Sequence, residues 1–197
     1  MIKVYEYSHL GGSEILTVRY PEIEREIDDV IAAITGLEKT KESQEKTKQG
    51  RMLYSPTEIN KRFRDEFRAR GYDELRESYA IELPGHPVKI RGAFKQVDFV
   101  KGRALVEVQF GKYFAMFYDM AKFQYFFNEN RADVGVEIVP WVGLKRQMSS
   151  GVSYGEQLVF DIERLKRHFP AVPVKVILVG LETLDQIGGE VVVSERQ

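Results

Sequence analysis

The sequence has 197 residues, the length of one ordinary domain with a sizeable core, and we expect a single domain over residues 1–197. A hydrophobic content of 43% fits a soluble globular protein, and no apolar run reaches the ~18–20 residues that span a bilayer. The absence of cysteine excludes disulfides, thiolate nucleophiles and cysteine-ligated zinc. The net charge of −1, taken alone, favours an enzyme that acts on a small molecule, although a balanced total can hide a local positive surface.

The N-terminal third predicts a strand and two helices. Residues 2–7 alternate as a short strand does, and they lack the apolar core of a signal peptide, so we expect a cytoplasmic protein. Pro21 begins a helix whose apolar residues follow the spacing i, i+4, i+7, i+8 and i+11, and Gly36 ends it. A second helix begins after Ser55, which can cap it, with Glu58 completing a capping box, and it runs to about Arg70.

The segment between these helices, residues 37–51, carries five basic residues and three glutamates. It contains no large apolar residue after Leu37. Two interpretations stay open. The segment is either a solvated loop or an arm whose basic residues, Lys48 among them, contact DNA phosphates.

The rest of the chain alternates strands with helices, which predicts an α/β fold with a mixed sheet flanked by helices. Residues 94–110 predict two strands joined by a turn at Lys101-Gly102. The other expected elements are a strand at 79–83, a helix at 112–130, a strand at 133–140, a polar loop at 145–154, a helix at 155–168 and a strand at 174–179. The tail from Leu184 is ambiguous. Aromatic residues are spread around the helix at 112–130 and do not form one narrow stripe. We therefore expect one side of this helix to pack on the sheet and another side on a helix or a second subunit.

Several kinds of active site have no support. His9, His86 and His168 do not stand in a metal-binding spacing, and each is expected to be an ordinary surface or loop histidine. The sequence contains no P-loop, no dinucleotide-binding glycine pattern and no G-x-S-x-G nucleophile turn.

One group of polar residues is suited to binding a metal ion. Asp98 falls on the first predicted strand of the hairpin, and Glu107 and Gln109 share one face of the second. Paired strands lie about 5 Å apart, so the two carboxylates can converge on one Mg²⁺ ion, which prefers oxygen ligands. Gln109 could hold the attacking water but is too weak a base to deprotonate it. The alternative is a salt-bridged pair at the end of a sheet.

Residues 97–113, VDFVKGRALVEVQFGKY, resemble the catalytic hairpin of the BglII/BstYI group of restriction endonucleases, part of the PD-(D/E)xK nuclease superfamily. In that group glutamine replaces the usual lysine, and Gln109 stands at that place. Residues 40–56, 133–140 and 148–154 also resemble segments of the group in the same order. The resemblance spans most of residues 1–180, with a shorter stretch before Asp98 than is usual in the group.

This resemblance implies a PD-(D/E)xK endonuclease core and a type II restriction endonuclease. It implies catalytic residues Asp98, Glu107 and Gln109, with Mg²⁺ held by Asp98, Glu107 and the carbonyl of Val108. It also implies a homodimer that clamps double-stranded DNA and cuts a palindromic GATC-containing site, RGATCY, leaving four-base 5′ overhangs. A cognate DNA methyltransferase is expected beside it.

In the group, the positions of Lys112 and the loop that contains Ser149, Ser150 and Ser153 lie near the bases. The residue types agree, because lysine can donate to guanine and serine hydroxyls can donate to the N7 atom of either purine. The alternative for the serine loop is an ordinary polar turn. Two rival functions are a less specific repair or mobile-element nuclease of the same superfamily, and a DNA-binding protein without catalytic activity.

Overall fold

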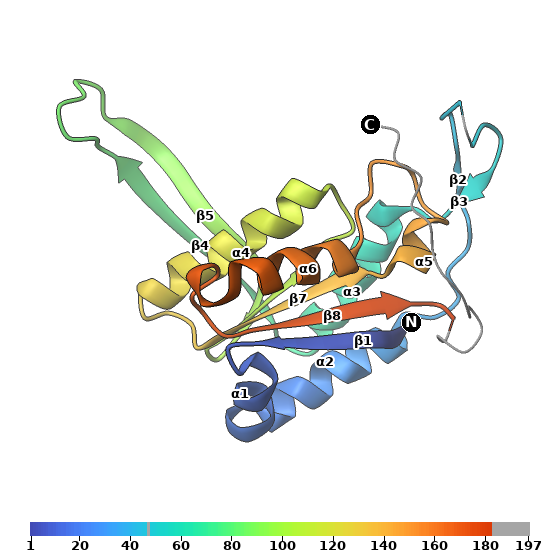
Figure 1. The fold of residues 1–197 in the computed structure, drawn as a ribbon, viewed down its shortest axis with the longest axis horizontal. Coiled ribbons are helices and arrows are strands. Elements are labelled where there is room, and N and C mark those ends of the chain that lie inside the picture. The colour runs from blue at the N-terminus through green and yellow to red at the C-terminus, as the bar shows by residue number, and fades with distance from the viewer. Residues whose placement is uncertain (47, 183–197) are drawn as a thin grey trace.

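The computed structural model describes residues 1–46 and 48–182, and the expected tail from Leu184 lies outside them (Figure 1). The strands are β1 (Ile2–His9), β2 (Lys41–Glu42), β3 (Met52–Leu53), β4 (Asp73–Ile81), β5 (Ile90–Lys101), β6 (Ala104–Val108), β7 (Val134–Pro140) and β8 (Val174–Gly180). The helices are α1 (Gly12–Arg19), α2 (Pro21–Ala33), α3 (Pro56–Ala69), α4 (Tyr113–Asn128), α5 (Val142–Lys145) and α6 (Gly155–Leu165), followed by a short 3₁₀ turn, η1 (Lys166–His168).

Six strands form one mixed sheet in the order β1-β8-β7-β6-β5-β4. The three strands β6, β7 and β8 run parallel, and the other neighbours pair antiparallel. Helices cover both faces of the parallel part, which is why β7 and β8 consist almost wholly of apolar residues and are buried along their entire length. The predicted mixed sheet flanked by helices is therefore confirmed. Strands β2 and β3 form a small separate ladder.

The helices form two layers, one on each face of the sheet (Figure 1). On one face, α1 packs on the sheet beside α2, and α3 adds a stack of aromatic rings in which Phe67 meets Phe99 and Phe63 meets Phe110. On the other face α4 and α6 lie side by side. Residues that alternate along β5 and β6 therefore point into two different layers.

Most of the local predictions are confirmed. The apolar stripe of α2 is buried, and the Ser55 side chain accepts a hydrogen bond from the Glu58 amide at the start of α3. The second half of the expected capping box is wrong, because the Glu58 carboxylate instead pairs with Thr40 and Arg62. Helix α1 was not predicted, and the strand expected at 79–83 is the end of the longer β4.

Strands β4 and β5 continue past the body of the molecule as a long twisted hairpin, drawn in green in Figure 1. Its base passes beside β6, where β5 contributes Asp98. None of the described helices combines the length and the apolar character needed to cross a membrane.

Candidate functional site

The predicted hairpin forms, and its two carboxylates fall at matching positions. Phe99 and Val106 form the last pair of the antiparallel ladder of β5 and β6, and Asp98 and Glu107 stand one residue beyond it on their strands, close enough for Asp98 to affect the pKa of Glu107. Side chains alternate across a strand, which turns both carboxylates away from the Phe99 layer and toward helix α4. Asp98 is exposed, whereas Glu107 is buried.

Helix α4 adds a second pair of charges to this face. Lys122 donates hydrogen bonds to the Glu107 carboxylate and to Asp119, whose Oδ1 lies 2.6 Å from Nζ. Asp119 and Lys122 stand three residues apart, so both side chains leave the same face of the helix. Burial alone would lower the pKa of Lys122, but the two neighbouring carboxylates outweigh that effect and raise it. The neighbouring carboxylates therefore favour the charged ammonium form of Lys122.

Gln109 follows strand β6 directly and is held by Asp119. Its backbone amide donates to the Ile138 carbonyl over 2.9 Å, which extends the pairing of β6 and β7 by one residue. Its side-chain Nε2 donates to Asp119 Oδ2 over 3.2 Å. Asp119 thus binds Lys122 through one oxygen and Gln109 through the other, and it connects the predicted catalytic glutamine to the carboxylate cluster.

A third buried carboxylate, Glu137, lies next to Glu107 on the parallel neighbour strand β7, where the two residues are in register. Glu137 is fully buried, and neither of its oxygens receives a hydrogen bond from a donor, although in its protonated form the carboxyl can donate to Asp119. Burial, followed by the charges of Asp119 and Glu107, raises the pKa of Glu137 well above its usual range. Burial and the charges of Asp119 and Asp98 raise the pKa of Glu107 in the same way, against the opposing effect of Lys122.

We predict that replacing Glu137 with glutamine stabilises the protein increasingly as the pH rises. The raised pKa means that the folded state holds a proton more tightly than the unfolded state, so native stability falls as the pH climbs from the ordinary value of 4.5 toward the raised value. Glutamine carries no charge and its amide can donate to the adjacent carboxylates, so the gain should reach about 1–3 kcal/mol. Urea denaturation of both proteins without metal, at pH values from about 5 to 9, measures it. Parallel stability curves would contradict the assignment.

The residues predicted to lie near DNA bases gather beside Gln109. Lys112 is exposed at the start of α4, immediately after Gly111. The Ser153 amide donates to the Gly111 carbonyl over 2.8 Å. This hydrogen bond fastens the serine loop to the segment between β6 and α4. Ser150 is exposed, Ser149 is partly buried and Ser153 is almost buried. The structure thus brings Lys112 and the serine loop together.

Lys48 lies on the segment that joins β2 and β3 and reaches the base of the serine loop. Its Nζ donates to the Met148 carbonyl over 2.8 Å and to the Arg146 carbonyl over 3.4 Å. From the same segment, Glu45 accepts a hydrogen bond of 2.8 Å from the Ser150 amide. Glu45 and Lys48 therefore support the serine loop, and a contact between Lys48 and DNA phosphates stays a prediction.

Three residues of the cluster, Asp119, Lys122 and Glu137, were not predicted. Glu137 had a signal, since it is the one charged residue in the apolar strand DVGVEIVP after its first position. Asp119 and Lys122 had a weaker signal, as charges three residues apart on a helix of mostly aromatic residues. Their approach to Glu107 depends on how α4 packs across the sheet, which no local pattern specifies.

The donor set of the cluster fits a divalent metal ion. Carboxylate oxygens are the ligands that Mg²⁺ and Ca²⁺ prefer, and burial together with mutual repulsion makes these carboxylates favourable partners for added positive charge. Within residues 1–46 and 48–182, no three His, Cys, Asp or Glu side chains are already arranged around a cation position. The predicted set of Asp98, Glu107 and the Val108 carbonyl needs only two of them.

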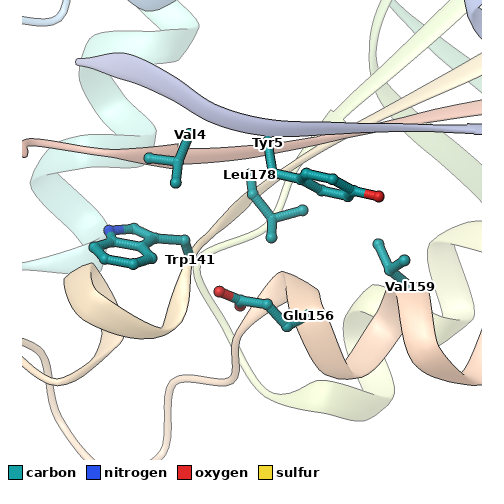
Figure 2. A pocket seen from close by; sticks show the side chains of 6 residues that line it. All are labelled: Val4, Tyr5, Trp141, Glu156, Val159 and Leu178. Carbon is teal, nitrogen blue, oxygen red and sulfur yellow. The ribbon is translucent and has the colours of Figure 1, made fainter. Parts of the chain in front are cut away.

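A cavity of about 360 Å³ lies elsewhere, between β1, β8, α5 and α6 (Figure 2). Val4, Tyr5, Trp141, Val159 and Leu178 give it an apolar wall. Its one carboxylate, Glu156, accepts the Val142 amide hydrogen bond, with both oxygens 3.1 Å from that nitrogen. Glu156 thus completes the start of α5, and we assign no chemistry to the cavity.

Comparisons with known proteins identify the family and the fold of the chain. The family model described as restriction endonuclease BglII/BglIII matches residues 4–180. A crystal structure of the restriction endonuclease BglII complexed with a DNA 16-mer superposes with a TM-score of 0.69 at 21% identity, over 89% of this chain and 75% of BglII. A crystal structure of free BglII gives 0.62 at 17% identity, over 91% of this chain and 80% of that one. No curated protein sequence matches the chain. The chain therefore belongs to the BglII/BglIII family of restriction endonucleases and is a type II site-specific nuclease that cleaves DNA.

Proposed function

We propose that this endonuclease acts as a homodimer, requires Mg²⁺ and cuts the palindromic site RGATCY to leave four-base 5′ overhangs. The observation that supports this proposal most directly is the cluster formed by Asp98, Glu107 and Gln109 beside the serine loop. A sequence-specific phosphodiesterase needs carboxylates that bind a metal, a polar side chain that orients water and flexible donors that contact base edges. All three kinds of group lie close together there.

Asp98, Glu107 and the Val108 carbonyl would hold the metal. When bound, Mg²⁺ acidifies a coordinated water and neutralises charge that develops on the scissile phosphate. Gln109 would orient the attacking water through its side-chain amide and would not take its proton, since a carboxamide is not a base at neutral pH. A side chain at position 111 would disturb this arrangement, because a Cβ there would lie 2.4 Å from Gln109 Oε1.

The cleavage test is digestion of plasmid DNA of known sequence with Mg²⁺, followed by mapping of the ends. We expect sharp bands whose ends lie four bases apart on the two strands. A smear would support the less specific nuclease of the same superfamily instead. Absence of cleavage with every divalent metal would support a DNA-binding protein without catalytic activity.

The outer base pair is expected to be read only as purine or pyrimidine. Ser149, Ser150 and Ser153 can donate to purine N7, which adenine and guanine share, whereas an arginine paired with O6 and N7 would demand guanine. Duplexes carrying AGATCT, GGATCC and AGATCC should be cut, and CGATCG should not. Each wrong central pair should cost roughly 1–3 kcal/mol. Cleavage of only one of the first three would mean a strict outer pair. A DNA methyltransferase of matching specificity is expected to protect the host.

The dimer would form through the exposed aromatic face of α4 and α6. The Phe114 side chain is 70% exposed and Phe160 is 55% exposed, although both are large and apolar. Tyr113 donates a hydrogen bond to Asp161, which ties the two helices together. A palindromic DNA site has twofold symmetry, so the fitting occupant of this face is the same face of a second copy.

We predict that the double substitution Phe114→Glu and Phe160→Glu converts the protein to a monomer. Buried aromatic anchors dominate interface energies, so the dimer dissociation constant should rise by at least about 100-fold. Light scattering at micromolar concentration would measure the mass of each protein. Val18→Glu is the matched control, because Val18 is 79% exposed on α1 and should leave the dimer intact. A dimeric double variant, or a native protein that is monomeric even with DNA, would refute this interface.

A further inference from the structure

Lys122 is a largely buried cation at the edge of the candidate metal site, where it contacts Glu107 and Asp119. Its side chain is only 13% exposed, and lysine is seldom buried without partners. It reaches Glu107, one of the two carboxylates proposed to hold the metal, from helix α4. The ion pair therefore uses a carboxylate that the proposed reaction also needs.

We propose that Lys122 is an internal counter-ion that neutralises the carboxylate cluster in the metal-free enzyme and competes with the divalent metal for Glu107. This inference rests on the proposed metal site. Two cations held by one buried carboxylate repel each other strongly, because charges at a few ångströms are weakly screened inside a protein. Metal binding at Glu107 therefore requires Lys122 to withdraw.

The second contact of Lys122, with Asp119, provides an alternative ion-pair partner for the ammonium when Glu107 binds the metal. Asp119 Oδ1 lies 2.6 Å from Nζ, so Lys122 can release Glu107 and remain paired. The four-carbon lysine stem allows such a shift without movement of the helix. Because Asp119 also accepts the hydrogen bond from Gln109, the withdrawal of Lys122 is connected to the side chain that orients the water. Lys122 is thus a positioning residue that acts through Glu107 and Asp119.

Removing the counter-ion should have two opposite consequences. The metal-free protein should lose stability, because Glu107 and Asp119 would become buried carboxylates without a cation. Affinity for the metal should rise, because the competitor is gone. A purely structural ion pair would show the first effect without the second.

The test is calorimetric titration of Ca²⁺ into the native dimer, without DNA and at mildly alkaline pH, compared with Lys122→Met and Lys122→Arg. Ca²⁺ takes the same oxygen ligands as Mg²⁺. We expect the methionine variant to bind Ca²⁺ about 10- to 100-fold more tightly than the native protein, since an adjacent positive charge is removed. The arginine variant keeps the charge and should bind close to native affinity. Unchanged or weaker binding by Lys122→Met would refute the competition.

Glu107→Gln separates this inference from the metal site itself. If Glu107→Gln binds Ca²⁺ as the native protein does, the proposed metal site is wrong. If Glu107→Gln loses binding while Lys122→Met gains none, the metal site stands and the role of Lys122 is wrong. Should Lys122→Met be unfolded without metal, Ca²⁺ is expected to restore its folding, and Lys122→Gln serves as a second variant. Failure of Ca²⁺ to refold either variant would also contradict the inference.

Discussion

Glu107→Gln is expected to reduce DNA cleavage by at least about 10³-fold, because loss of a metal ligand removes several kcal/mol of transition-state stabilisation and each 1.4 kcal/mol is a factor of ten. Glutamine keeps the shape of the side chain and can still contact Lys122, so the fold should survive. Asp98→Asn should have a similar effect on the rate. Single-turnover cleavage of a duplex containing the site measures both.

Binding of the same duplex should persist in both variants, since the proposed base contacts come from Lys112 and the serine loop. Glu22→Gln is the matched control, because Glu22 is an exposed carboxylate at the start of α2 and lies outside the cluster. It should cut at the native rate. Cleavage within tenfold of native by either Glu107→Gln or Asp98→Asn would remove that residue from the active site.

Phe123→Ala is expected to lower the free energy of unfolding by about 3–5 kcal/mol, the usual cost of emptying a buried aromatic site. Phe123 is fully buried on α4 and packs over Gly135 of β7. The cavity left by the substitution should stay largely open, because the sheet and the helix that surround it are rigid. Urea denaturation at one fixed protein concentration measures the loss, since the stability of the proposed dimer would depend on concentration. Val18→Ala, at an exposed site of α1, should change stability by less than about 0.5 kcal/mol.

A second substitution tests whether Gly135 is required by this contact. A Cβ at position 135 would lie 2.5 Å from Phe123 Cδ2, so Gly135→Ala alone should destabilise the protein by about 1–3 kcal/mol. In the Phe123→Ala background the same methyl group enters the emptied space and should cost little or restore stability. Additive effects of the two substitutions would contradict this explanation of the glycine.

The elements that could be predicted are those whose pattern is local. The stripe of isoleucines in α2, the Ser55 cap and the turn between Lys101 and Ala104 each depend on residues that are neighbours in the chain. Asp98 and Glu107 could be paired for the same reason, since a tight hairpin brings them together. Helix α1 was missed because its apolar residues form no clear stripe; it carries Leu16 into the core and leaves Val18 exposed.

The residues that could not be predicted depend on tertiary packing. Lys122 and Asp119 meet Glu107 because α4 crosses the sheet over β5 and β7, and Glu137 joins them because β7 pairs in parallel with β6. A parallel pair is connected through a whole helix, so nothing in the two strands alone states their register. Similarly, the basic segment at 37–51 gave no sign that Lys48 would bind the carbonyls beneath the serine loop.

The hydrogen bond from the Ser153 amide to the Gly111 carbonyl has a consequence for fidelity. Gly111 lies so close to the Gln109 side chain that a Cβ there would be 2.4 Å from Oε1, so a shift of the loop would be passed to the residue proposed to orient the nucleophile. A DNA sequence that displaces the loop by a fraction of an ångström would then lower the cleavage rate more than it lowers the affinity of the enzyme for that DNA. Near-cognate sites are accordingly expected to be bound, scanned and released uncut, with discrimination residing in kcat and not in Kd.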